Sequence, residues 1–396
     1  MTNHILQFHS PGSGCRDSVP LGNGDVAANA WSSPDGTWHW YPAKNDAWDE
    51  SMRLLKLGHL KLWTAPPGAT DQWEETLNPQ TAVWEVRQGN TCIRSWIEAK
   101  EPVLRIQVES TTPRQWFCSW DQWRTRERFL EGQEQHAAKG LEHGPWQPRV
   151  YPDECLDNDR QGIVWCHVNR SSLRPLLLRQ QGLADWEEEE ADPLFPWAFG
   201  GRLEASESVK ENATTLRSDG AVKTWSITLT LHSGRYPDAP SWLDGLNEAR
   251  GEHTVTSAKP SPHHLAHWQS LTQRSFIHPE GFAEAEALQK ALLWQRYITL
   301  CTGTGTWPIK FNGSLFTARW GYTEPDRPED FDPDYRRWGG GYWFQNTRLS
   351  YWPLLTSGDH ECFDALFCFY LDRLPFHRFR ARQYFGHEGA FLPEVQ

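Results

Sequence analysis

The hydrophobic pattern changes its period near residue 260, and this change constrains the fold more than any other feature of the sequence. Before it, apolar and polar residues alternate in short runs separated by turn residues, as in residues 57–63 and 91–98. A period of two predicts antiparallel strands joined by short turns. After it, residues 263–271 and 283–300 carry apolar side chains at helical spacing. The chain is therefore predicted to be a β-domain followed by helices rather than a series of βαβ units.

Three regions follow from this pattern. Residues 1–255 are predicted to form a β-sandwich domain, residues 256–280 a linker helix, and residues 281–396 the first helices of an all-helical domain. In the last region, residues 345–355 and 359–374 indicate two consecutive helices joined by a short loop. Asp359 is expected to act as the N-cap of the second helix.

The charge balance argues against two classes of partner. Lys and Arg number 39 and Asp and Glu 51, which gives a formal net charge of −12. Nucleic acids and anionic membranes both require a positive protein surface, so neither is an expected partner. No apolar run approaches the roughly 20 residues of a membrane-spanning helix. The first residues lack the basic and apolar regions of a signal peptide, which predicts a cytoplasmic location for the chain as written, while a start further upstream would allow secretion.

Tryptophan and cysteine are the informative residue types. The chain has 24 Trp residues among 396. A large core and a carbohydrate-handling protein, in which indole faces stack on sugar rings, both explain this number, and composition alone favours the core. The eight Cys residues show no C-x-x-C motif and no spacing with His that is typical of a metal site. They are expected to be free thiols, and no metal is expected.

Residues 334–352 hold the densest set of side chains suited to a ligand. Trp338 and Trp343 alternate there with Arg337, Asn346 and Arg348. Flat apolar faces beside amide and guanidinium donors suit a sugar, which needs both stacking and hydrogen bonds to its hydroxyls. These five residues are therefore candidates for sugar binding. A purely structural aromatic corner is the alternative interpretation.

Two other segments add candidates. The loop at residues 306–317 contributes Asn312, because loops between helices often carry binding residues. The C-terminal segment contributes His387 as a candidate for substrate binding and Glu394 as the candidate catalytic carboxylate. By contrast, the acidic run at residues 187–190 is predicted to be a solvated loop. The glycines around Asn23 predict a tight turn before a strand, since the segment lacks the spacing of a phosphate-binding loop.

Four motifs carry a resemblance to a known family. PLGNGDVAANAW at residues 20–31 is similar to the opening motif of the fucosidase- and galactosidase-type glycoside hydrolases of family ninety-five. The other three motifs more specifically resemble a related bacterial family known as domain of unknown function 5703. They are FNGSLF at residues 311–316, DYRRWGGGYWFQNTRLSYWPLLTSGD at 334–359 and GHEGAFLPE at 386–394.

The resemblance implies an N-terminal β-super-sandwich, a linker helix and an (α/α)6 toroid with the sugar site at its centre. Only about four helices fit after residue 260 at typical helix lengths, so the toroid would be incomplete in this chain. A C-terminal half or a partner chain would supply the remainder. In the fucosidases, two Asn residues of this segment position the attacking water. One of these positions falls on Asn346, and Phe344 stands at the other.

The expected function is that of a glycoside hydrolase, or the N-terminal part of one, that acts by inversion. Inversion uses two carboxyl groups roughly 6.5–9.5 Å apart and needs no cofactor. Glu394 is the candidate for one of them, although neither it nor Glu388 or Asp334 matches an assigned catalytic position of the family. The alternative is a non-catalytic carbohydrate-binding or scaffold protein.

Overall fold

The computed structural model describes residues 5–66, 72–142, 144–156, 162–250, 259–275, 277–317 and 331–396. The strands are β1 (Leu6–Phe8), β2 (Val19–Gly22), β3 (Val26–Ser32), β4 (Trp38–Trp48), β5 (Leu54–Lys56), β6 (His59–Ala65), β7 (Trp73–Asn78), β8 (Val83–Gln88), β9 (Thr91–Ile97), β10 (Val103–Asp121), β11 (Arg128–Phe129), β12 (Arg149–Val150), β13 (Glu154–Cys155), β14 (Gly162–Val168), β15 (Ala198–Ala205), β16 (Ser208–Asn212), β17 (Thr215–Ser218) and β18 (Val222–Gly234). The helices are α1 (Arg174–Gln180), α2 (Ala239–Arg250), α3 (Pro262–Arg274), α4 (Ala285–Gly303), α5 (Phe344–Ser357), α6 (Cys362–Leu371) and α7 (Leu374–Phe385).

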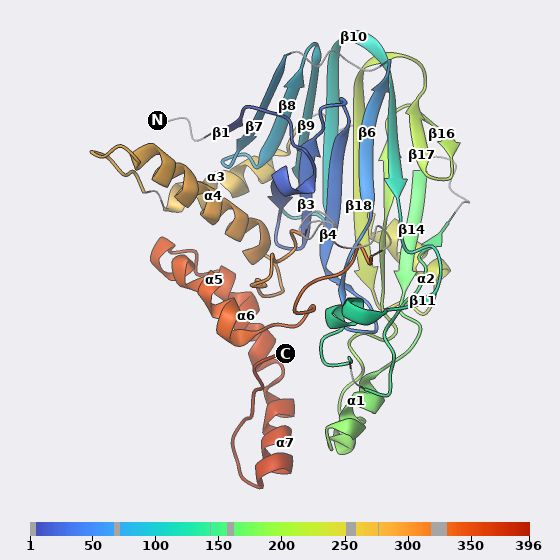
Figure 1. The fold of residues 1–396 in the computed structure, drawn as a ribbon, viewed down its shortest axis with the longest axis vertical. Helices are drawn as coiled ribbons and strands as arrows, with labels where there is room; N and C mark the ends of the chain where they lie inside the picture. The colour runs from blue at the N-terminus through green and yellow to red at the C-terminus, as the bar shows by residue number, and fades with distance from the viewer. Residues whose placement is uncertain are drawn as a thin grey trace.

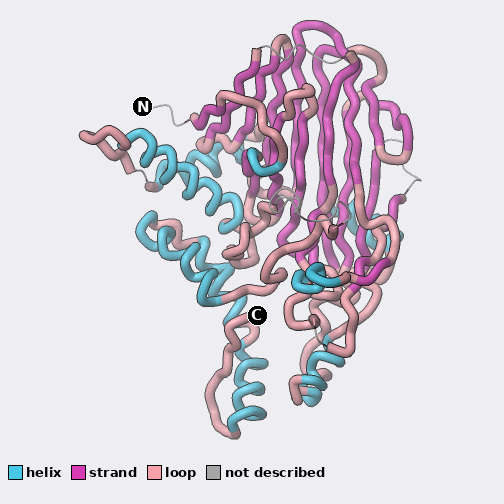
Figure 2. The backbone as a smooth tube through the Cα atoms, viewed as in Figure 1, coloured by secondary structure: helices cyan, strands magenta, loops and turns pink. Residues whose placement is uncertain are grey.

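The strands form one block, and α3 to α6 lie along one side of it (Figures 1 and 2). Apart from the short α1, the helices follow the last strand in the sequence. The predicted order of a large antiparallel β-domain followed by helices is thereby confirmed. Within the ranges given above, no helix combines the length and the apolar character that a bilayer crossing requires.

The long strand β10 joins the two halves of the sheet. Its first part pairs with β9 and β18, and after an irregularity between Glu109 and Arg114 its second part pairs with β6 and β17. The two halves pack against each other through tryptophan. Trp40 of β4 meets Trp84 of β8 edge-on, with ring centroids 5.8 Å apart, and its Nε1 donates a hydrogen bond to Ser95 Oγ of β9 at 3.1 Å. This arrangement is a sandwich whose layers share one strand.

Tryptophan supplies much of the core. In the part of the chain that the structure describes, nine Trp residues are almost fully buried: Trp40, Trp84, Trp96, Trp116, Trp120, Trp165, Trp225, Trp242 and Trp268. An indole ring buries more apolar area than other side chains, so these residues contribute strongly to hydrophobic stabilisation. The core interpretation of the Trp content is correct for them.

The Gly-Asn-Gly turn before β3 is also the point where α4 meets the sandwich. Gly24 N donates a hydrogen bond to the Cys301 carbonyl at 2.8 Å. A Cβ atom at Gly24 would lie 2.1 Å from the backbone nitrogen of Gly305. Asn23 holds the turn, because its Oδ1 accepts a hydrogen bond from the backbone nitrogen of Val26 at 2.8 Å. The turn was predicted, whereas its contact with the end of α4 was not.

The prediction for Asp359 was wrong in one respect. The predicted helix at residues 359–374 corresponds to the shorter α6, Cys362–Leu371, and a separate helix, α7, begins at Leu374. Asp359 does not cap α6 with its side chain, since its carboxylate instead accepts hydrogen bonds from Arg296 at 2.7 and 2.9 Å. A buried carboxylate gains more from a bidentate guanidinium partner than from backbone N–H groups, and this pair ties α4 to the loop before α6.

Candidate functional site

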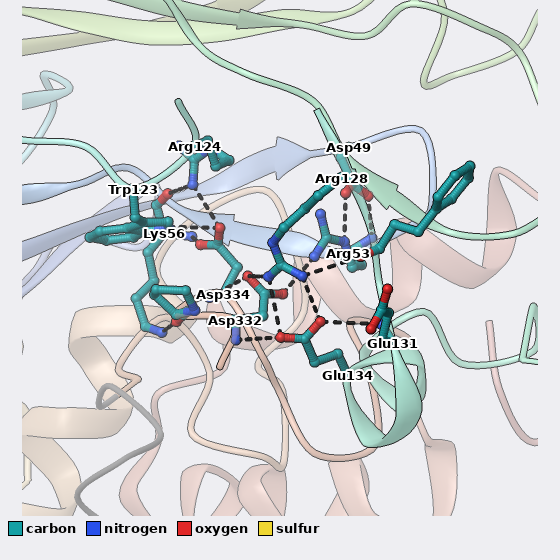
Figure 3. A network of polar contacts seen from close by, with 12 residues as sticks. Asp49, Arg53, Lys56, Trp123, Arg124, Arg128, Glu131, Glu134, Asp332 and Asp334 are labelled. Carbon is teal, nitrogen blue, oxygen red and sulfur yellow. Dashed lines mark hydrogen bonds and ion pairs between the residues drawn. The ribbon is translucent and has the colours of Figure 1, made fainter. Parts of the chain in front are cut away.

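The segment that carries the aromatic motif is held to the sandwich by buried charges (Figure 3). Asp334 Oδ2 accepts hydrogen bonds from Arg124 Nη1 and Trp123 Nε1, both at 2.8 Å. Its Oδ1 accepts one from the backbone nitrogen of Lys56 at 2.9 Å. Burial alone would raise the pKa of Asp334, but the positive charges of Arg124 and Lys56 hold it below its usual value. Asp334 is therefore an ionised anchor rather than a proton donor.

Asp332 forms a second anchor two residues earlier. Its carboxylate accepts a hydrogen bond from Arg53 Nη1 at 2.8 Å, and the Arg53 Nε donates to Asp49 at 2.7 Å. The backbone nitrogen of Asp332 donates to Glu134 Oε1 at 2.7 Å. All four side chains are buried. Paired charges of this kind fix geometry strongly, because removal of one partner leaves the other unpaired in the interior.

Close packing explains the glycines that follow Trp338 in the sequence. Trp338 has φ of 71°, a left-handed conformation that is rare for a bulky residue and costs about 1–3 kcal/mol. A Cβ atom at Gly339 would lie 2.8 Å from Lys139 Cβ, and one at Gly340 would lie 2.5 Å from the Trp48 ring. The turn therefore passes directly against the sandwich. As a result, the Trp338 side chain is 46% exposed.

Two tryptophans and a phenylalanine form an aromatic face, defined here as Phe311, Trp338 and Trp343. The Trp338 and Trp343 rings are nearly perpendicular, with centroids 5.7 Å apart. Trp343 Nε1 donates a hydrogen bond to the Trp338 carbonyl at 3.0 Å, and Phe311 meets the Trp343 ring edge-on at 6.4 Å. The guanidinium of Arg337 lies 5.8 Å from the centroid of the Trp338 ring. The exposed Trp338 indole and the half-buried Trp343 indole beside a cation suit a flat, polar ligand.

Asn312 fixes the turn from the neighbouring loop. Its Nδ2 donates hydrogen bonds to the carbonyls of Arg337 at 3.0 Å and Gly339 at 2.9 Å. Both carbonyls belong to the turn on either side of Trp338. In this structure, Asn312 thus positions the aromatic face through the backbone.

Glu394 lies at the N-terminus of α5. Residues 342–344 pair with the terminal segment, since Tyr342 N donates to the Gln396 carbonyl at 2.9 Å and Phe344 N to the Glu394 carbonyl at 3.0 Å. The Glu394 side chain accepts a hydrogen bond from the backbone nitrogen of Gln345 at 2.7 Å. A carboxylate in this place satisfies a free N–H group and complements the helix dipole. In this backbone pairing, Val395 lies opposite Trp343, and Glu394 is paired with Phe344.

The other candidates lie further along the helices. Asn346 and Arg348 are exposed on α5. Arg348 Nε donates to the Gln345 carbonyl at 2.9 Å, and its guanidinium lies 5.5 Å from the centroid of the Trp352 ring. His387 follows the end of α7, where its ring stacks on Phe385 at 5.9 Å and its Nδ1 lies 2.8 Å from the Glu388 carbonyl. In Figure 1, α7 extends away from α5 and α6 before the chain returns to its C-terminus.

Sequence reasoning missed Lys310, which lies beneath the same turn. Its Nζ is 3.3 Å from the ring centroid of Tyr342 and 4.4 Å from that of Trp48, and it donates to the Gly340 carbonyl. Burial, with a smaller effect of the nearby Arg336, holds the pKa of Lys310 well below its ordinary value. The sequence around Lys310 does not predict its burial between aromatic rings, because one of these rings belongs to Trp48, which lies more than 200 residues earlier.

A comparison with known protein families confirms the family that the motifs resemble, through a match in the part of the chain that precedes three of the four motifs. Residues 7–277 match the N-terminal family model described as domain of unknown function (DUF5703). The sequence matches no curated protein. A solved structure of a human-microbiome protein, provisionally named kojibiose phosphorylase, is similar with a TM-score of 0.50 and 10% sequence identity. The similarity covers 99% of this chain and 49% of that one, so the chain spans about half the length of this structural relative, and at such identity the likeness is one of fold alone. The family match extends over more than half of the chain, which therefore belongs to the DUF5703 family.

Proposed function

We propose that the chain is the sugar-binding front part of a carbohydrate-active enzyme, a glycoside hydrolase that acts by inversion. The observation that carries this proposal is the aromatic face at the N-terminus of α5, next to Glu394. Trp338 and Trp343 offer two rings at nearly right angles, and Arg337 adds a hydrogen-bond donor beside them. Apolar faces with a few placed polar groups are what a sugar ring requires. Asn346 and Arg348 would extend this site along α5, with His387 as a more distant contact.

The proposed chemistry needs two carboxyl groups on opposite sides of the scissile bond. Glu394 is the proposed general acid or hydroxyl contact, because the contacts of the described residues bring its carboxylate to the N-terminus of α5, which directly follows Trp343 of the aromatic face. The second carboxyl group would come from the rest of an (α/α)6 toroid, of which α4 to α7 would be the first helices. The structural relative is about twice as long as this chain. This length supports the proposal that the rest of the toroid belongs to a longer form of this chain or to a partner chain. Hydrolysis by two carboxyl groups and water requires no cofactor.

A glycan array followed by calorimetry tests whether the chain binds carbohydrate. We expect specific binding by the wild type and loss of binding by Trp343→Ala. For the glycans that bind, ¹H NMR of the sugar released by a longer protein or complex that includes the rest of the toroid tests hydrolysis, with inversion of the anomeric configuration as the expected result. Glu394→Gln keeps an oxygen that can accept the Gln345 N–H, so it should reduce turnover without a large change in Tm.

Binding without turnover by that longer protein or complex would favour the alternative, a non-catalytic carbohydrate-binding protein. The observation behind this alternative is that the contacts of the described residues bring one carboxylate, that of Glu394, to the N-terminus of α5. Absence of binding to any glycan would contradict both functions.

A further inference from the structure

A cavity of about 580 Å³ lies between the α1 region and α7, next to the terminal segment. Beside aliphatic side chains and three carboxylates, its lining includes three guanidinium groups and three aromatic rings: Arg174, Arg373, Arg380, Phe376, Tyr384 and Phe391. Pro393, Val395 and Gln396 also border it, so the cavity adjoins the segment that carries Glu394. None of these three arginines was singled out by the sequence.

Contacts between distant segments build this cavity. Trp186, which follows α1, packs against Phe376 at 5.5 Å and Phe379 at 5.1 Å between ring centroids. Tyr384 Oη donates a hydrogen bond to the Gln181 carbonyl at 2.9 Å, and Arg380 Nη2 donates to Gln181 Oε1 at 3.1 Å. The wall formed by α7 is therefore held in place by the β-domain.

The three arginines have no carboxylate partner among the described residues. Arg174 donates hydrogen bonds to the carbonyls of Trp186 and Glu187, and Arg373 donates to the carbonyl of Phe369. Arg380 has the most unusual environment, because it is only 8% exposed. Its Nε and Nη1 are buried without a hydrogen-bond partner in the described part of the chain.

The acidic side chains that line the same cavity accept hydrogen bonds from groups other than these arginines. Glu50 accepts a hydrogen bond from the backbone nitrogen of Arg170 at 3.2 Å and lies 4.0 Å from His167 Nε2. Asp192 accepts hydrogen bonds from the Ser172 hydroxyl and from the backbone nitrogen of Leu194. Glu190 lies at the end of the acidic run, with Trp186 Nε1 3.5 Å from its carboxylate. Among the described residues, none of these three carboxylates forms an ion pair with Arg174, Arg373 or Arg380, so each arginine can still bind an anionic partner.

A buried guanidinium without a counter-ion is costly, and an anion that reaches it recovers much of that cost through charge-assisted hydrogen bonds. Aromatic rings beside such a guanidinium suit the ring of a sugar rather than a bare ion.

We propose that this cavity binds an acidic sugar unit, with its carboxylate toward Arg380 and Arg373 and its ring against Phe376 and Tyr384. This inference rests on the proposed carbohydrate function and adds a substrate class to it, namely glycans that contain a sugar acid. A sulfate or phosphate group would present the same anionic oxygens, so the experiment must separate these sources.

Isothermal titration calorimetry with sodium D-glucuronate, D-glucose and inorganic phosphate tests the proposal. We expect wild-type protein to bind glucuronate at least about tenfold more tightly than glucose, and Arg380→Gln to abolish that preference. Arg382→Gln is the matched control, because Arg382 is exposed on α7 and lies 3.8 Å from Glu388. It should keep the preference for glucuronate. If Arg380→Gln fails to fold, Arg373→Gln, which changes a more exposed residue of the same cavity, should weaken the preference.

Equal affinities for glucuronate and glucose would overturn the proposal, as would an unchanged preference in both Arg380→Gln and Arg373→Gln. Phosphate that binds as tightly as glucuronate and depends on Arg380 would also overturn it, in favour of a site for free phosphate. The test of this cavity is independent of the sugar binding proposed for the aromatic face, because Trp338→Ala should leave glucuronate binding to the cavity unchanged.

Discussion

The carboxylate of Asp334 accepts a hydrogen bond from the guanidinium of Arg124 at 2.8 Å, across 210 residues of sequence. Both side chains are almost completely buried. Arg124 belongs to the β-domain, whereas Asp334 begins the turn that ends at Trp343. The β-domain therefore positions the aromatic face directly, and the two parts of the chain share one site.

Replacement of Asp334 should destabilise the whole protein. In Asp334→Ala, Arg124 loses a buried partner, and we expect the free energy of unfolding to fall by about 3–5 kcal/mol in urea titrations. The control is Glu286→Ala, which breaks the exposed ion pair with Lys290 and should change stability little. A loss below about 1 kcal/mol in Asp334→Ala would show that the anchor is not structural.

The contact between Gly24 and Gly305 predicts a steric effect that a control can separate from backbone strain. Gly24 has φ of 89°, and Gly220 has φ of 94° with no atom within 4 Å of an added Cβ. Gly220→Ala should cost about 1–2 kcal/mol from the left-handed backbone alone. Gly24→Ala should cost about 1–3 kcal/mol more, since its Cβ would meet Gly305 N at 2.1 Å. Equal losses in denaturant titrations would contradict the tight contact.

Glu75 should make the protein less stable as the pH rises. Burial raises the pKa of Glu75 to about 7, although hydrogen bonds from Trp84 and Ser32 oppose the shift. Between its unfolded pKa near 4.5 and about 7, the folded state binds the extra proton, so the free energy of unfolding decreases with increasing pH across this window. Glu75→Gln should lose this decrease and exceed the wild type in stability at pH 8. Parallel stability–pH curves for both proteins would refute the assignment.

The order of β-domain and helices was predictable because hydrophobic period is a local property. The pattern changes where Pro260 and Pro262 interrupt the chain, and α3 begins at Pro262. The turn at Asn23 was predictable for the same reason, since glycines on both sides of Asn favour it.

The charged anchors were not predictable, because their partners are distant in sequence. Arg53 and Lys56 flank two leucines before β6, which gives no indication that Arg53 pairs with Asp332. Asp359 illustrates the same limit, since its position before a helix favours a cap while tertiary structure supplies Arg296. The glycines after Trp338 gave no indication of their neighbours, and only the structure shows that Lys139 and Trp48 lie against Gly339 and Gly340.

Glycan binding by Trp338→Ala, measured beside the wild type, tests directly whether the aromatic face binds sugar. Trp63→Ala is the matched control, since Trp63 stacks on Phe117 at 5.5 Å on β6 and β10, outside the aromatic face. On a glycan array and then by calorimetry, the wild type and Trp63→Ala should bind the same glycan, while Trp338→Ala should lose about tenfold in affinity with little change in Tm. Wild-type affinity in Trp338→Ala, or a loss of affinity matched by a large fall in Tm, would contradict the account.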